Sequence, residues 1–253
     1  MDNIQTIIAT IFILLGAIHI GRNISVLFPR AHMDGETKDA VKLGLALITT
    51  LAAFVLGLLV SSGKSAFENQ TTAVSEMVSE AATFDEMLVH YGNGSENVLT
   101  DFRSASKRMI LSLWDESFET QEFQIKEALK TSNEKFINDV ALLPASDDRS
   151  RFFKDSALAS ATSLIKARFR LATLQHSVIP LPMVMTIVHW LACIFIIFGF
   201  CSPGNMTAMV SEYVGAFCAT AAIFLIVELD HPFTGLIQIS RTPASMALLA
   251  LGG

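Results

Sequence analysis

Ionisable side chains stand at two kinds of position where the chain is otherwise strongly apolar. Glu228, Asp230 and His231 cluster where the last long apolar segment ends, whereas His189 and Glu212 lie inside such segments. An ionisable group buried unpaired in hydrocarbon is expensive, so residues of this kind are candidate functional groups in a membrane protein. The chemistry that they offer is the binding of an ion or the formation of an ion pair.

Each group also has a structural explanation. Acids at the C-terminal end of a helix oppose the helix dipole, so we expect the cluster at 228–231 to form an ion pair rather than to bind a ligand. Glu212 could lie at headgroup level, and His189 beside Trp190 suits the aromatic belt of a membrane interface. The candidate partners of the cluster are Arg22, Arg30 and Arg241.

Motifs for catalysis, for a cofactor and for a metal are absent from the sequence. There is no Gly-x-Ser-x-Gly, no Walker loop, no dinucleotide fingerprint, and no His-x-x-x-His or Cys-x-x-Cys spacing. The net charge of −6 also leaves no basic footprint for nucleic acid. We therefore expect a protein that is not an enzyme and that holds no cofactor and no metal.

The apolar residues that surround these groups form four long segments, at residues 3–21, 43–63, 178–202 and 206–227. Each has about the 20 apolar residues that a helix needs to cross a bilayer. Most charged residues lie between the second and third segments. The sequence thus predicts four parts: two membrane spans at 1–63, a polar block at 64–177, two further spans at 178–228 and a tail at 229–253 that lies at the membrane interface or packs on the bundle.

The second span is rich in small and hydroxyl-bearing residues. Such residues let helices approach closely where lipid supplies no hydrophobic drive, and they could equally line a pore. Both interpretations stay open. The pore-lining candidates are Thr49, Thr50, Ala53, Gly57 and Ser61.

In the polar block the apolar pattern changes from a continuous run to a stripe. Residues of a first set recur every seven positions from Phe67 to Leu88, and a second set follows three places later, from Gln70 to Tyr91. This spacing is typical of a helix packed along one seam. Gly92, Asn93 and Gly94 suit a helix C-cap and turn, and we expect Ser95 to be the N-cap of the next helix.

Further apolar stripes follow in the same block, separated by short turns. One runs through residues 98–113 with Trp114 after it, the next from Phe123 to Leu143 before Pro144, and the last from Phe152 towards Pro180. Short turns between amphipathic helices indicate antiparallel neighbours. The predicted fold is all-α, with four transmembrane helices in a 2+2 order flanking a long antiparallel helical bundle.

The end of the fourth span carries the run Leu229, Asp230, His231, Pro232, Phe233, Thr234 and Gly235, followed by Ser240 and Pro243. This run resembles the C-terminal signature of the bestrophin-like membrane proteins of unknown function, which reads roughly Leu-Asp-Arg-Pro-Phe-Ser-Gly. His231 stands where that signature has Arg. Residues 55–59, residues 67–70 and Trp114 are similar to other parts of the family pattern, and the resemblance covers about residues 44–243.

The resemblance implies an order of two spans, a helical cytosolic domain and two spans, with both termini and the polar block cytoplasmic. Because bestrophins are oligomeric anion channels, it implies a homo-oligomeric, multi-pass protein of the lipid bilayer that conducts ions. The small and hydroxyl-bearing residues of span 2, taken with this layout, place the expected ion path along that span. A second hypothesis is a non-enzymatic accessory or scaffold subunit of a larger membrane complex. The long seam of the polar block favours this alternative.

Overall fold

The structure is a computed structural model, and it describes residues 3–27, 35–113, 134–174, 179–230, 232–233, 235–242 and 244–246. These residues form helices and no strand, which confirms the predicted all-α class. The helices are α1 (Asn3–Leu27), α2 (Gly35–Tyr91), α3 (Glu96–Ser112), α5 (Asp148–Leu174), α6 (Leu181–Cys201) and α7 (Met206–Leu229), and residues 134–141 are also helical.

The chain divides into two compact units. Unit 1 comprises residues 1–66 and 177–231, and unit 2 comprises residues 67–176 and 232–253. Helix α2 contributes its first half to unit 1 and its second half to unit 2. The four-part division predicted from the sequence stays a prediction.

Unit 1 contains the helices that can cross a membrane. Within the described residues, four helices are long and apolar enough: α1, α2, α6 and α7. Less than half of each apolar window is buried inside the chain, so most of their apolar surface faces outward. Such a surface belongs against hydrocarbon or against another protein, and the chain is therefore a membrane protein.

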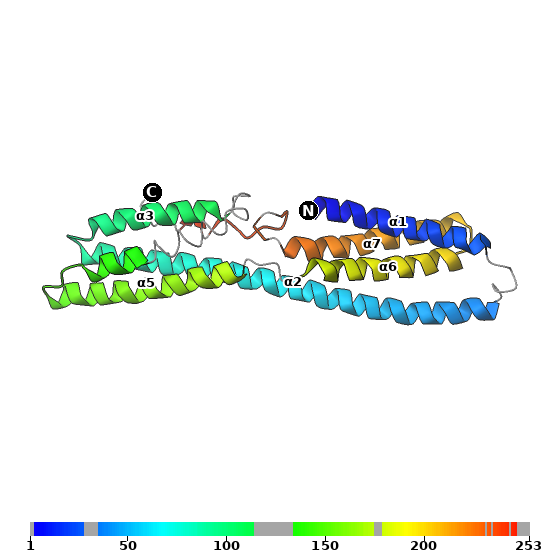
Figure 1. Cartoon of the computed structure of the whole chain (residues 1–253), viewed down its shortest axis with the longest axis horizontal. Helices are drawn as coiled ribbons and strands as arrows, with labels where there is room; N and C mark the ends of the chain where they lie inside the picture. The colour runs from blue at the N-terminus through cyan, green and yellow to red at the C-terminus, as the bar shows by residue number, and fades with distance from the viewer. Residues whose placement is uncertain are drawn as a thin grey trace. The chain divides into compact units, whose positions relative to one another are not determined.

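Helices α1, α6 and α7 run side by side in unit 1 (Figure 1). The closest contact joins α1 to α6, because a Cβ atom at Gly21 would overlap the backbone carbonyl of Ile196, and one at Gly199 would overlap that of Ile18. Two glycines facing opposite backbones let the helices approach more closely than any side chain would allow. The first half of α2 joins this core through Leu45, Ala52 and Leu59.

In unit 2, the second half of α2 packs with α3 and α5 (Figure 1). The predicted seam is confirmed from Gln70 to Leu88, since both of its sets are buried there. In the stripe expected from Phe123 to Leu143, Phe136, Val140 and Leu143 are buried. The earlier residues of this stripe, and Trp114 before it, lie outside the described part of the chain.

The turn between α2 and α3 follows the sequence in one respect and departs from it in another. Gly92 and Gly94 have φ angles of +85° and +104°, a backbone conformation that favours glycine. Ser95 is the N-cap residue of α3, as predicted, but its side chain makes no N-cap hydrogen bond to that helix. The hydroxyl of Ser95 lies instead at hydrogen-bond distance from the carbonyls of Leu88 and Gly92 at the end of α2.

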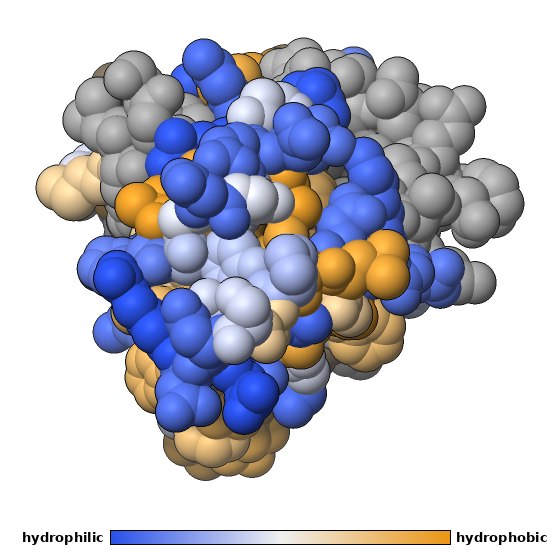
Figure 2. Space-filling view, turned by 90° about the vertical axis from the view of Figure 1, so that its left-hand side faces the viewer, coloured by the Kyte–Doolittle hydropathy of each residue, from blue (hydrophilic) through white to orange (hydrophobic). Residues whose placement is uncertain are grey.

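Ion pairs join α2 to its neighbours in unit 2. Arg103 on α3 donates two hydrogen bonds to Asp85, at 2.7 Å and 2.8 Å, and this contact raises the pKa of Arg103. Arg170 on α5 pairs with Glu76 at 2.7 Å. Hydrophilic residues cover much of the end of the molecule where the α2–α3 turn lies, as Figure 2 shows.

The described part of the C-terminal tail packs in unit 2. Ile239 and Ala244 are buried in its hydrophobic core, and Phe233 packs against that core. The amide of Ile239 donates to the carbonyl of Pro232 at 2.9 Å, which closes this segment into a loop. The predicted signature therefore begins in unit 1 and ends in unit 2.

The α1–α6 contact leads to the first testable prediction. We expect Gly199→Ala to destabilise the protein by about 1–3 kcal/mol, because the added methyl group forces two packed backbones apart. Unfolding of the purified protein in detergent micelles, followed by circular dichroism, measures this change. Gly16→Ala is the matched control in α1, since a Cβ there has no atom within 4 Å. Equal stability of the two variants would contradict the contact.

Candidate functional site

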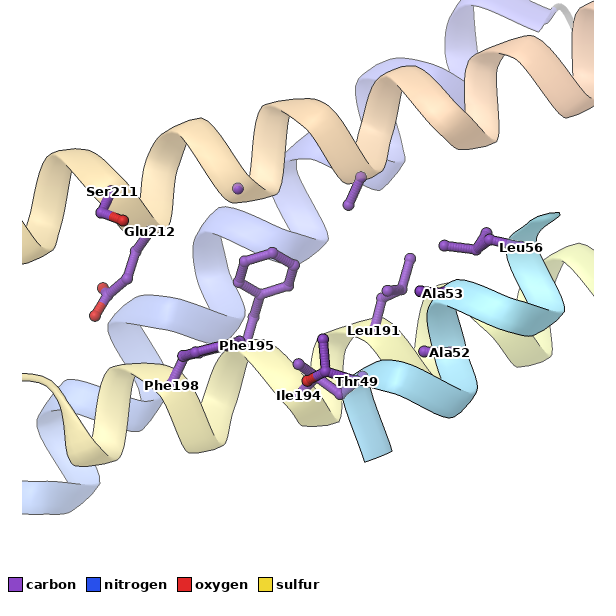
Figure 3. Close-up of a pocket in the computed structure, with 12 residues that line it drawn as sticks. Thr49, Ala52, Ala53, Leu56, Leu191, Ile194, Phe195, Phe198, Ser211 and Glu212 are labelled. Atoms are coloured by element: carbon purple, nitrogen blue, oxygen red, sulfur yellow. The ribbon is translucent and has the colours of Figure 1, made fainter. Parts of the chain in front are cut away.

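Unit 1 holds a cavity of about 400 Å³ between α2, α6 and α7. Its volume is within the range of about 300–1,000 Å³ that is usual for small-molecule sites. Figure 3 shows the three helices around it, with the aromatic ring of Phe195 between them. The residues that line it are Thr49, Ala52, Ala53, Leu56, Leu191, Ile194, Phe195, Phe198, Ser211, Glu212, Gly215 and Ala219.

The residues that each helix contributes are mostly three or four positions apart, so they lie on one face of that helix. The cavity lies where these three faces meet. On α7 the contributors Ser211, Gly215 and Ala219 stand four residues apart, so one stripe of small residues leaves room beside α6. The sequence interpretation missed this stripe because it weighed small residues only in span 2. The same four-residue spacing could have revealed it.

The polar end of the cavity is an ion pair between distant parts of the chain. Arg22 on α1 donates from Nη2 to Oε2 of Glu212 on α7, at 2.9 Å. The side chain of Glu212 is 9% exposed and that of Arg22 is 24% exposed. A buried carboxylate needs such a partner, and Arg22 provides it for Glu212 in a mostly apolar lining.

A second polar contact lies next to this pair on the same two helices. The hydroxyl of Tyr213 and Nε2 of His19 are 3.1 Å apart, a hydrogen-bond distance. His19 precedes Arg22 by one helical turn, so α1 and α7 are joined by two adjacent polar contacts. Together these contacts fix the orientation of the helix that carries Glu212.

One hydroxyl group in the cavity lacks a protein partner. Oγ1 of Thr49 is buried and has no hydrogen-bond partner among the described residues. Buried hydroxyl groups are normally paired with protein or water. Thr49 therefore offers a hydrogen bond to water or to a ligand inside the cavity.

The structure separates the predicted pore-lining residues. Thr49 and Ala53 line the cavity, whereas Thr50, Gly57 and Ser61 are exposed on the surface of the chain. The hydroxyl of Thr50 donates to the carbonyl of Ala46 in its own helix, at 2.8 Å. Of the two candidates that line the cavity, Thr49 is half-buried and Ala53 is exposed like the other three.

The remaining predicted residues lie apart from the cavity. Glu228, Leu229 and Asp230 are buried at the end of α7, and His231 lies outside the described residues. Arg22, expected as a partner of this cluster, binds Glu212 instead. Of the rest of the signature, Pro232 is buried, and Phe233 and Gly235 are half-buried.

His189 is exposed near the middle of α6, and its Nε2 lies 3.8 Å from Sγ of Cys193. The residue belongs to a helix with a membrane-span composition. Within the described residues, no three His, Cys, Asp or Glu side chains gather in a way that could hold a metal ion.

Comparison with protein families finds one match: the model of the family described as Bestrophin-like domain matches residues 13–244. Comparison with curated proteins and with solved structures finds no match.

The ion pair at the cavity leads to the second prediction. We expect Glu212→Gln to lower the free energy of unfolding by up to about 3 kcal/mol. This is the low end of the range for breaking a buried ion pair, because the side chain of Arg22 is partly exposed. The double variant Arg22→Gln/Glu212→Gln should cost less than the two single variants together, since no charge is left alone. A double-mutant cycle on unfolding in micelles measures this coupling.

The exposed pair between Lys42 and Asp39, at 2.9 Å in the same unit, is the control. The double-mutant cycle for this exposed pair should give a coupling energy of about 0.5 kcal/mol or less. Additive effects at Arg22 and Glu212 would show that these residues do not act as a pair.

Proposed function

The chain belongs to the bestrophin-like family, and on that basis we propose that it is a subunit of an oligomeric anion channel. The observation that carries the proposal is the surface of α2, the helix with the most apolar window of the four. Anions are the ions conducted by bestrophins, so the ion type follows from the family alone. The cytoplasmic location of unit 2 is a proposal on the same basis.

Helix α2 presents three adjoining faces along its membrane segment. The first, with Leu45, Ala52 and Leu59, is buried in unit 1. The second, with large side chains, is exposed and suits lipid; it comprises Leu43, Leu47, Leu51, Phe54 and Leu58. The third is exposed, small and partly hydroxylated; it comprises Ala46, Thr50, Ala53, Gly57 and Ser61.

The small face is where we place the contact between subunits and the ion path. Small residues allow helices of neighbouring subunits to approach closely, and the hydroxyl groups of Thr50 and Ser61 can face water. Large apolar side chains at the same positions would fit lipid better. In the assembled channel, α2 therefore lines the path with this face and meets the bilayer with Leu47 and Leu51.

The exposed polar residues of α6 also support an assembly. Thr186, His189 and Cys193 stand on one side of this helix at helical spacing, and all three are exposed in the single chain. An ionisable residue that faces lipid near the middle of a span is expensive. We therefore expect His189 to contact a neighbouring subunit or a water-filled path, and not lipid.

Cysteine modification tests the proposed path. The background is a channel in which the native cysteines, Cys193, Cys201 and Cys218, are replaced. A charged thiol reagent should change the conductance of the Thr50→Cys and Gly57→Cys channels at least about tenfold faster than that of the Leu51→Cys channel. The reason is that the reagent reaches only thiols exposed to water. Planar-bilayer recording measures the rates. Equal rates at the three positions, or no conductance at any anion concentration, would contradict the proposal.

The alternative is an accessory or scaffold subunit of a larger membrane complex. Exposed large apolar side chains on unit 2 favour it, because they offer a surface to a partner. These residues include Leu111, Leu142, Phe152 and Phe169, each more than half exposed.

Electron microscopy of the native, solubilised complex separates the two proposals. We expect a closed ring of identical subunits in contact through the small face of α2. Substituting Gly57 with Leu should reduce the ring to smaller species, because the larger side chain blocks close approach. Gly44→Leu, at a glycine of the same helix that also has open space around it, tests position dependence. A heteromeric particle with one copy of this chain would favour the scaffold.

A further inference from the structure

The cavity of unit 1 between α2, α6 and α7 has a polar end and an apolar end. Thr49 is the first lining residue of α2, and Ser211 and Glu212 are the first lining residues of α7. Figure 3 shows Glu212 and Leu56 on opposite sides of the cavity. The opposite end is lined by apolar side chains, namely Leu56, Leu191 and Ala219. A cavity of this kind fits a molecule that has one polar group and an apolar body.

The polar end lies toward the turn that joins α6 to α7. Helix α7 begins at Met206, so Glu212 stands less than about two turns from that end of the span. Leu191 and Ala219, in contrast, lie near the middle of their helices. The ends of a spanning helix lie near the lipid headgroups, and its middle lies in the hydrocarbon. The cavity therefore has the same polarity as an amphiphile in the bilayer.

The size of the cavity suits a single-chain molecule. A cavity of about 150 Å³ holds one benzene molecule, so a volume of about 400 Å³ holds a molecule roughly two to three times as large. The lining of α2 from Thr49 to Leu56 covers about 10 Å of helix, too short a space for a lipid with two long acyl chains. Ala53 and Phe198 are exposed lining residues, so the cavity opens to the outside of the chain.

The hydroxyl group of Thr49 specifies a hydrogen-bonding ligand. Threonine hydroxyls elsewhere in the same unit donate to a carbonyl one turn earlier, as that of Thr220 does to Ala216 at 2.9 Å. Oγ1 of Thr49 is buried and makes no such bond among the described residues. A hydroxyl group can donate one hydrogen bond and accept others. Its natural complement in an otherwise apolar space is a second hydroxyl group.

The charges around the cavity favour a ligand without charge. Glu212 is the one ionisable residue of the described lining, and it is paired with Arg22 at 2.9 Å. A charged ligand needs a partner of its own when it leaves water, and the lining offers no second ionisable group. A carboxylate would also lie in the same cavity as the carboxylate of Glu212. An uncharged polar group avoids both costs.

We propose that this cavity binds an uncharged long-chain alcohol from the bilayer. The ligand's hydroxyl group forms a hydrogen bond with Oγ1 of Thr49, and its chain extends between Leu56 and Leu191. Because the ligand contacts α2, α6 and α7 together, its binding stabilises the packing of α2 on the other two helices. The site does not depend on the proposed ion path, and it holds whether or not the protein conducts.

Thermal unfolding with three probes of equal chain length tests the class of ligand. The full chain in lipid nanodiscs is heated with increasing mole fractions of dodecanol, dodecane or dodecanoate. We expect Tm to rise and to saturate with dodecanol, as for a ligand that binds only the folded state. The other two probes should give no saturating rise. An equal rise with dodecane or with dodecanoate, or no saturation with dodecanol, would overturn the proposal.

Two threonine variants test the contact. Thr49→Val keeps the shape of the side chain and should raise the half-saturating mole fraction of dodecanol roughly threefold to tenfold, since one hydrogen bond is lost. Thr220→Val is the matched control, because Thr220 is a buried residue of α7 that does not line the cavity. Its response to dodecanol should equal that of the unsubstituted protein. If Thr49→Val also leaves the response unchanged, the proposal is wrong.

A measurement on the unsubstituted protein tests the orientation of the ligand. Crystals grown with a dodecanol that carries bromine at the end of its chain should show an anomalous peak between Leu56 and Leu191. A peak beside Thr49 would place the chain the wrong way round, and a cavity filled with water would mean that the alcohol does not bind. Either result would contradict the proposal.

Discussion

The close approach of α1 and α6 at Gly21 and Gly199 is the contact on which unit 1 depends. In hydrocarbon, apolar side chains gain nothing by leaving lipid for protein, so helices associate through van der Waals contact and polar bonds. The two glycines bring the backbones together, and α7 then packs beside α1. This arrangement sets the distance across which Arg22 reaches Glu212, and it leaves α2 to close the large cavity.

The two units satisfy their polar groups in different ways. In unit 1, the charge of Glu212 is balanced by Arg22 on another helix, and Thr49 is left with a hydrogen bond to offer. In unit 2, Asp85 and Arg103 form a close bidentate pair, whereas the buried hydroxyl of Ser106 lines a small cavity and has no partner among the described residues. A fully paired group fixes packing, and a group with remaining capacity is where a ligand can bind.

Helix α2 takes part in both units, and its composition changes accordingly. Its first half carries small, apolar and hydroxyl-bearing residues on separate faces, as a helix among lipid and other helices requires. Its second half carries a seven-residue repeat of buried side chains with charges on the other side, as a helix of a water-exposed bundle requires. The proposed ion path uses the first half.

Local patterns in the sequence were enough to predict the class of the fold and much of its core. Hydropathy predicts the four segments of membrane length, the seven-residue period predicts the seam from Gln70 to Leu88, and backbone freedom predicts the turn glycines at 92 and 94. These patterns depend only on neighbouring residues.

The partner of Glu212 could not be found in this way. Arg22 lies 190 residues away, and several arginines were equally compatible with each acid. The same holds for the two cavities, because each depends on how closely helices distant in the chain pack together. That packing is settled by the shapes and charges of all the faces at once, which no local pattern contains.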